Sequence, residues 1–290
     1  RVFAAIEADA FALAFRRWVS GVAPALEQNE VVSIDGKTSR RSGKVGGTPL
    51  HLVSAFAAGA GLVLGQQATT VKSNEKTAIP ELLATLALEG CIVTIDAMGT
   101  QPSIAQAIRD RGADYILSVK GNQPTLAESM EDFFATFQAT PDKTPHSFDE
   151  VVEKDHGRIE TRRAVWVPRI DWLPEAILKA WPTLGAMGMI ETTQEKGLGE
   201  SATISTERRY FIMSRGVTTV GDFSRAVRAH WGIESMHWIL DVTFREDACR
   251  VRKDAAARNL SLLRKITLAM LRLDTAYPKS SLRQRRNRAS

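Results

Sequence analysis

One short stretch near the start of the chain, VVSIDGKTS at residues 31–39, limits the folds that this sequence can adopt. Valine and isoleucine favour strands, so residues 31–35 are expected to form a buried strand that ends at Asp35. Gly36 and Lys37 follow directly and predict a turn. An aspartate at the carboxyl end of a buried strand lies where α/β proteins carry their binding and catalytic groups. The stretch therefore favours an α/β fold in which Asp35 is functional.

The same design returns in CIVTIDAMG at residues 91–99, where a second apolar strand is expected to end at Asp96. A third acid, Glu234, lies in the aromatic-rich segment 228–247, which is expected to be helical. We hypothesise that these three acids form one metal-binding site. Each also has an ordinary structural interpretation: Asp35 as a turn residue, Asp96 as a helix N-cap and Glu234 as half of a surface ion pair.

The elements around these acids predict a mixed α/β domain. Segments 50–58 and 62–69 flank a Gly-Ala-Gly turn and are expected to form a hairpin, which adds two antiparallel strands to the first one. This order, followed by alternating helices and strands, predicts an RNase H-like fold. A doubly wound nucleotide-binding fold is the alternative, but no GxGxxG or GxxxxGK loop follows a strand. The alternating elements are expected at 75–89, 91–96, 102–111, 115–120 and 124–138.

Five regions are expected along the chain. Residues 1–30 would be the end of an N-terminal helical region whose upstream part is missing, because the sequence begins with arginine. Short strand-like runs separated by proline and glycine predict a β-rich insertion at 140–215, which would delay the last acid in sequence. The other regions are 31–139 as the first part of the RNase H-like core, 216–275 as C-terminal helices (219–246 and 255–273) that complete the core, and 276–290 as a basic tail.

The composition is that of a globular protein. Hydrophobic residues make up 44% of the 290 residues and charged residues 24%. No apolar run approaches the roughly 20 residues of a membrane span, and no signal peptide is evident, so a cytoplasmic, nucleoid-associated protein is expected. A net charge of +5 favours a polyanionic partner. Basic residues cluster at Arg40, Arg41 and Lys44, at Arg162 and Arg163, and at Arg283, Arg285, Arg286 and Arg288, where they also fit a solvated surface and a frayed tail.

Three carboxylates on a rigid scaffold suit the cleavage and transfer of phosphodiesters. That chemistry needs an activated oxygen nucleophile, a stabilised leaving oxygen and neutralised phosphate charge, which two metal ions about 4 Å apart can supply. Mg²⁺ prefers carboxylate oxygens and keeps water and phosphate as its other ligands. A zinc site from His230, Glu234 and His237, at i, i+4 and i+7, is an alternative, but it lacks an HExxH motif or suitable cysteines.

Five long motifs occur in order over nearly the whole chain: SIDGKTSR at 33–40, TIDAMGTQ at 94–101, YILSVKGNQ at 115–123, HGRIETRR at 156–163 and HWGIESMHWILDVTFREDACR at 230–250. Together they resemble bacterial insertion-sequence transposases of the DDE class, specifically the ISAs-type, H-repeat-associated family. The resemblance implies an RNase H-like core, Mg²⁺ or Mn²⁺, and cutting and joining of double-stranded DNA at transposon ends and target. It also implies a homodimer when assembled on DNA and the catalytic triad Asp35, Asp96 and Glu234.

The chain departs from the tyrosine, arginine, glutamate and lysine signature of related transposases. His230 stands at the arginine position, and Asp241 stands at the lysine position, where it is a competing acid. Asp241 lies two helical turns, roughly 10 Å, beyond Glu234, so the two cannot easily share a metal ion. We expect Glu234 to be the third ligand, because its neighbours Trp231 and Trp238 predict a face packed against the sheet.

Other residues in these motifs are candidates for contacts with DNA. Side chains just after strand ends or beside the third acid would contact phosphates, which provides affinity without sequence reading. Two alternative functions remain: a catalytically inactive transposase remnant that binds DNA, and an RNase H-like nuclease that cuts without joining. The candidate DNA-binding residues are Lys37, Lys120, Asn122, Arg158, Arg228, His230 and Trp231.

Overall fold

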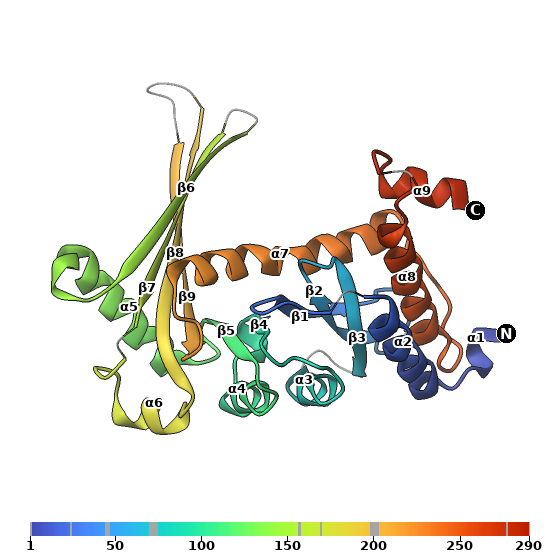
Figure 1. Ribbon diagram of the computed structural model, residues 1–290, viewed down its shortest axis with the longest axis horizontal. Helices are drawn as coiled ribbons and strands as arrows, with labels where there is room; N and C mark the ends of the chain where they lie inside the picture. The colour runs from blue at the N-terminus through green and yellow to red at the C-terminus, as the bar shows by residue number, and fades with distance from the viewer. Residues whose placement is uncertain are drawn as a thin grey trace. The chain divides into compact units, whose positions relative to one another are not determined.

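The structure of the chain is a computed structural model. Its contacts divide the chain into two compact units, Arg1–Cys91 with Ala229–Ser290 and Ile92–Arg228. Figure 1 labels the elements of both units along the coloured chain. The described residues are 2–23, 25–43, 47–69, 75–155, 158–168, 170–197, 203–276 and 278–289, so Lys44 lies outside them.

Three antiparallel strands in the order β3-β2-β1 form the centre of the first unit. They are β1 (Val31–Thr38), β2 (His51–Ala57) and β3 (Leu62–Thr69), and the predicted hairpin is confirmed. Gly61 ends the hairpin turn with a φ of 68°, in the left-handed region that glycine adopts readily. Most side chains of β2 and β3 are buried, so both faces of this sheet need a cover.

Helices cover both faces of the three strands (Figure 1). On one face, α8 (Ala256–Leu273) inserts Lys265 and α7 (Val220–Val242) places Gly232 close to the ring of Phe56. On the other face, α3 (Glu75–Leu83) packs Leu82 against Gly65. The other helices of this unit are α1 (Val2–Ala5), α2 (Ala8–Val22), which contacts β3 and α8, and α9 (Leu282–Ala289).

A buried lysine lies on the face that α7 and α8 cover. The strand register aligns Asp35, Ser54 and Gln66 across the sheet, so their side chains share one face. Nζ of Lys265 donates to Oγ of Ser54 at 2.9 Å and to Oε1 of Gln66 at 2.6 Å. Burial lowers the pKa of Lys265 to about 8, although the charge of Glu246 opposes the shift. The interior of this unit is therefore polar as well as apolar.

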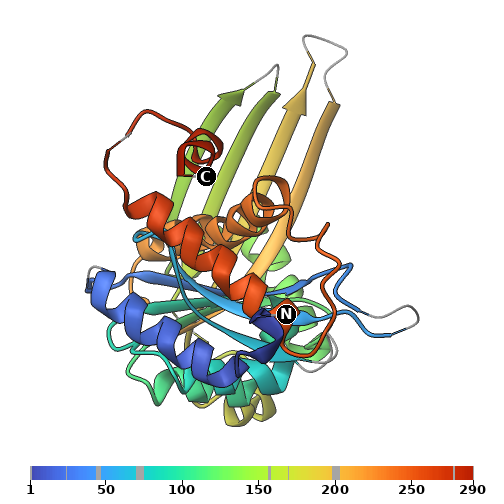
Figure 2. The same cartoon turned by 90° about the vertical axis from the view of Figure 1, so that its right-hand side faces the viewer.

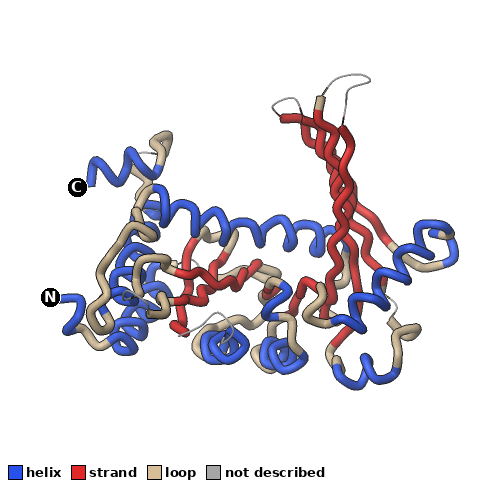
Figure 3. The backbone as a smooth tube through the Cα atoms, turned by 180° about the vertical axis from the view of Figure 1, so that it is seen from behind, coloured by secondary structure: helices blue, strands red, loops and turns tan. Residues whose placement is uncertain are grey.

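The second unit contains β4 (Ile92–Ile95), β5 (Asp114–Val119), β9 (Thr203–Ser214), β8 (Leu184–Lys196), β7 (Arg158–Val167) and β6 (Ser147–Asp155), in that spatial order. β4 and β5 are parallel, and the remaining neighbours are antiparallel. Figures 2 and 3 show β6 to β9 as long strands lying side by side. Its helices, besides the first part of α7, are η2 (Ala97–Gly99), α4 (Pro102–Arg109), α5 (Pro124–Ala139), η3 (Pro141–Lys143) and α6 (Glu175–Ala180).

Three predicted boundaries differ from the structure by more than two residues. The first strand does not end at Asp35 but continues to Thr38, and Gly36 lies within it. α3 ends at Leu83, short of residue 89, because the hydroxyl of Thr85 donates to the carbonyl of Leu82 and turns the chain. α7 ends at Val242, before the expected residue 246, and the predicted basic tail contains α9. Among the described residues, no helix has the length and apolarity needed to cross a bilayer.

The low pKa of Lys265 makes stability depend on pH. Between pH 8 and 10.5 the unfolded chain binds more protons than the folded one at this residue, so its contribution to the free energy of unfolding rises with pH. At ~1.4 kcal/mol per pKa unit the rise amounts to about 3 kcal/mol. In urea titrations across this range, Lys265→Met should lack that rise. Lys179→Met, which removes an exposed lysine, should show the same pH dependence as the wild type. If the free energy of unfolding of Lys265→Met rose with pH as steeply as that of the wild type, the lowered pKa of Lys265 would be contradicted.

Candidate functional site

Asp35 points its carboxylate toward α7. Oδ1 accepts a hydrogen bond from the backbone N–H of Gly36 at 2.8 Å, and Oδ2 lies 3.3 Å from Nδ1 of His237. Burial alone would raise the pKa of Asp35, but the hydrogen bond and charge of His237, the N–H of Gly36 and the charge of His230 together hold it below its usual value. The carboxyl is therefore anionic at neutral pH.

The opposite face of β1 explains why glycine follows Asp35. His51 Nε2 and Glu75 Oε1 form a buried pair at 2.5 Å, and His51 Nδ1 lies 2.8 Å from the hydroxyl of Thr38. A Cβ on Gly36 would overlap the Glu75 carboxylate and lie 2.6 Å from His51 Nε2. Gly36 therefore makes room for the buried His51–Glu75 contact, at a position where the sequence pattern predicted a turn.

Glu234 lies on the exposed side of α7. The buried positions of this part of the helix are Ile233, Met236 and Leu240, whereas Trp231 and Trp238 are 41% and 62% exposed. The prediction that both tryptophans pack against the sheet is thus wrong, because the side chains that this part of the helix buries are Ile233, Met236 and Leu240. His230 and His237 both act on Asp35 and lie one helical turn on either side of Glu234, so Glu234 shares their side of the helix.

Lys37 is enclosed by acids. Its Nζ lies 2.8 Å from Asp241 Oδ1, 3.4 Å from Glu246 Oε2 and 3.1 Å from Asp247 Oδ1, and its side chain is 13% exposed. Burial would lower the pKa of Lys37, but these carboxylates raise it above its usual value. The ammonium does not face solvent as a DNA contact would, which replaces our interpretation of Lys37 as a phosphate ligand.

In the second unit, Asp96 follows β4 and caps η2. Its Oδ1 accepts from the backbone N–H groups of Met98 at 3.1 Å and Gly99 at 3.3 Å, so Asp96 caps η2 and not the expected helix α4, whose N-cap is Gln101. Thr100, fully buried, donates to the carbonyl of Ser118 at 2.6 Å. The amide of Asn122 donates to the carbonyls of Ala97 and Thr100. Asn122, predicted to contact DNA, therefore also braces the loop that carries Asp96.

The remaining DNA candidates differ in exposure. Lys120 is exposed at the end of β5, and Trp231 is exposed on α7. The side chains of Arg158 and Arg228 are 45% and 49% exposed and form long ion pairs with Glu160 and Glu153, at 3.9 and 3.4 Å. His230 is half-buried and acts on Asp35.

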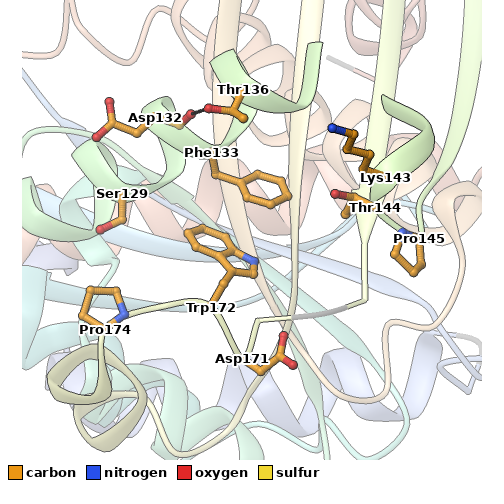
Figure 4. Close-up of a pocket in the computed structure, with 10 residues that line it drawn as sticks. All are labelled: Ser129, Asp132, Phe133, Thr136, Lys143, Thr144, Pro145, Asp171, Trp172 and Pro174. Carbon is orange, nitrogen blue, oxygen red and sulfur yellow. Dashed lines mark hydrogen bonds between the residues drawn. The ribbon is translucent and has the colours of Figure 1, made fainter. Parts of the chain in front are cut away.

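A pocket in the second unit contains none of the predicted acids. Phe133 and Trp172 stack in it with ring centroids 4.3 Å apart. Figure 4 shows both rings among the residues that line the pocket. Its lining also includes Asp132, Lys143 and Asp171. Within the described ranges, no group of three His, Cys, Asp or Glu side chains converges closely enough to hold a metal ion as it stands.

The structural roles of His237, Thr100, His51 and Glu75 were not predicted from the sequence. His237 was considered as part of an alternative zinc site, and its spacing of seven from His230 was the available signal for a shared helix side. Thr100, His51 and Glu75 carried no signal, because their partners lie far away in sequence or behind a strand.

Comparison with known proteins assigns the family. Residues 27–270 match the family described as "Transposase DDE domain", and the chain belongs to these bacterial insertion-sequence DDE transposases. It is 39% identical over its whole length to "Putative transposase YncI" of Escherichia coli O157:H7, of which it covers 73%. It is 34% identical to "H repeat-associated putative transposase YhhI" of Escherichia coli (strain K12), with 100% of this chain and 76% of that one covered. The resemblance inferred from the motifs is confirmed.

A solved structure shares the fold. The piggyBac transposase in a synaptic complex with hairpin DNA matches with a TM-score of 0.50 at 9% sequence identity. The match covers 90% of this chain and 52% of that one, so the chain spans about half the length of this relative. The mixed α/β architecture is thus that of a transposase.

The loop after Asp96 should depend on the Thr100 hydroxyl. Thr100→Val removes the donor that the buried Thr100 offers to the carbonyl of Ser118, which should lower the free energy of unfolding by about 1–3 kcal/mol in urea titrations. Hydrogen exchange at the Met98 and Gly99 amides should accelerate as the loop loosens. Thr136→Val removes a hydroxyl from the exposed side of α5 and should change stability by less than about 0.5 kcal/mol. Equal effects of the two substitutions would refute the role of Thr100.

Proposed function

We propose that this chain is the catalytic region of a DDE transposase that cleaves DNA strands at insertion-sequence ends and joins them to target DNA, with Asp35, Asp96 and Glu234 as its catalytic acids on an RNase H-like core. The observation that carries the proposal is the Asp35 carboxylate, kept anionic on a strand and turned toward the side of α7 that bears Glu234. Family membership supports the assignment of Asp96, which lies in the second unit.

The donor chemistry of the three acids fits Mg²⁺ or Mn²⁺. These hard cations prefer carboxylate oxygens, and Asp35 is ionised, as a ligand must be. Asp35, Asp96 and Glu234 would hold the metal, which we expect to be two ions. When bound, the metal activates the attacking oxygen and neutralises charge on the phosphate and leaving oxygen.

The other residues of the chain hold these acids in place. His237 and the N–H of Gly36 keep the Asp35 carboxylate oriented and charged. The amides of Met98 and Gly99 fix Oδ1 of Asp96, while Thr100 and Asn122 fix the loop. Catalysis by positioned charges needs such preorganisation, because a loosely held acid must reorganise during the reaction.

Double-stranded DNA is the proposed partner, as transposon end and as target. Exposed Lys120 and the half-exposed Arg158 and Arg228 supply cations for phosphates, and His230 and Trp231 lie beside Glu234 on α7. The solved piggyBac synaptic complex contains hairpin DNA, which is consistent with a DNA substrate for this chain. We further propose that two copies act together on a pair of ends.

Removing the negative charge of the acids should abolish cleavage but spare DNA binding. Asp35→Asn, Asp96→Asn and Glu234→Gln should each reduce Mg²⁺-dependent cutting of labelled element ends by at least about 10³-fold, since each removes a metal ligand. Asp241→Asn should reduce cutting only partly. The experiment uses the full-length protein and measures binding by fluorescence anisotropy in parallel.

Matched controls separate the alternatives. Asp132→Asn and Glu128→Gln change exposed acids on α5 and should cut normally. Normal cutting by Asp35→Asn would exclude the proposed site, and a normal Mn²⁺ response in Glu234→Gln with none in Asp241→Asn would move the third ligand to Asp241. A wild type that binds without cutting would be an inactive remnant, and one that cuts without joining would be a nuclease.

DNA affinity should fall steeply with salt, because phosphate contacts release counterions. Each contact adds about 0.9 to the slope of log affinity against log salt, so Lys120→Gln should lower that slope by about one unit. Lys179→Gln, also an exposed lysine of the second unit, should leave the slope unchanged. Identical slopes for both variants would remove Lys120 from the DNA contacts.

A further inference from the structure

Lys37 connects the strand of Asp35 to the helix of Glu234. Lys37 lies two residues after Asp35 in β1, so both side chains leave the strand on the face that α7 covers. Asp241, its nearest partner at 2.8 Å, lies seven residues after Glu234 on the same helix. The ion pair therefore fixes the end of α7 on β1, close to both acids.

The chain reverses after α7 to bring two more carboxylates to Lys37. The helix ends at Val242, and Arg245 adopts a φ of 52°, which is unfavourable for a residue with a side chain. The N–H of Glu246 then donates to the carbonyl of Leu240 at 3.0 Å. A non-glycine residue persists in this conformation only where its surroundings impose it, and here the turn places Glu246 and Asp247 within 3.4 Å of Lys37.

The energetic cost of leaving a buried charge unpaired restricts the geometry of this cluster. Glu246 is only 3% exposed, so its charge must be compensated by a neighbouring cation. Losing one partner of such a buried pair is costly, whereas an exposed pair such as Lys179–Glu175 contributes little. A shift of α7 along β1 would separate Lys37 from these acids, so the cluster favours one position of the helix.

We propose that Lys37 is a positioning residue: by pairing with Asp241, Glu246 and Asp247, it holds α7 at the one position on β1 at which Asp35 and Glu234 can serve the same metal site. The inference rests on the proposed function, since it takes both acids as ligands. Lys37 acts through α7 and contacts neither substrate nor metal.

Metal binding without DNA tests this role in the full-length protein. Tb³⁺ is a hard ion that replaces divalent cations at carboxylate sites, and Trp231 and Trp238, one turn from Glu234, should sensitise its luminescence. Lys37→Met and Asp241→Asn should each weaken Tb³⁺ binding by about 10-fold to 100-fold, as loss of outer-shell support does. Because Asp241 acts through Lys37, the double variant should bind Tb³⁺ no more weakly than Lys37→Met alone.

Controls make the result decisive. Lys37→Arg keeps the charge and should recover most of the affinity, and Lys179→Met should bind Tb³⁺ like the wild type. Circular dichroism reports whether each variant folds. If Lys37→Met does not fold, the test uses Asp241→Asn, in which Lys37 keeps Glu246 and Asp247 as partners. Wild-type Tb³⁺ affinity in folded Lys37→Met, or in Asp241→Asn, would overturn the inference. If Asp35→Asn also leaves Tb³⁺ binding unchanged, the proposed metal site itself fails.

Discussion

Lys37 extends from β1 into a group of three carboxylates, and segments from the two ends of the chain meet there. β1 lies near the start of the sequence, whereas Asp241, Glu246 and Asp247 follow some 200 residues later. An ion pair between residues so distant in sequence joins the two segments of the first unit, between which the second unit is inserted in the chain. Buried ion pairs are well suited to join two such segments in one position, because a misplaced helix would leave carboxylates without a partner.

The opposite face of β1 is fixed by a second buried pair. His51 and Glu75 join β2 to the first residue of α3, and the space they need is available only because residue 36 has no side chain. Asp35 is therefore followed by two constrained neighbours, Gly36 and Lys37, on a strand held from both faces. Its own carboxylate needs only His237 and one backbone N–H to set its direction.

Much of the fold could be predicted from local pattern. The three antiparallel strands and most of the later helices and strands follow from apolar runs, turn glycines and proline positions, all of which act over a few residues. What could not be predicted depends on distant partners. Gly36 was interpreted as a turn, because the His51–Glu75 pair that occupies its space is invisible in a linear sequence. Trp231 and Trp238 were expected to be buried, because aromatic residues usually are, but the helix buries Ile233 and Met236 instead.

The two units hold their acids by different means. The loop of Asp96 is braced by neutral hydrogen bonds from Thr100 and Asn122, all within 27 residues of sequence, so its geometry is local. The strand of Asp35 depends instead on charge that the end of α7 provides. The pairing with Lys37 also gives Asp241 a structural role. Since Lys37 already supplies an ammonium, an acid at position 241 completes the pair, whereas a lysine there would bring two like charges within ion-pair distance.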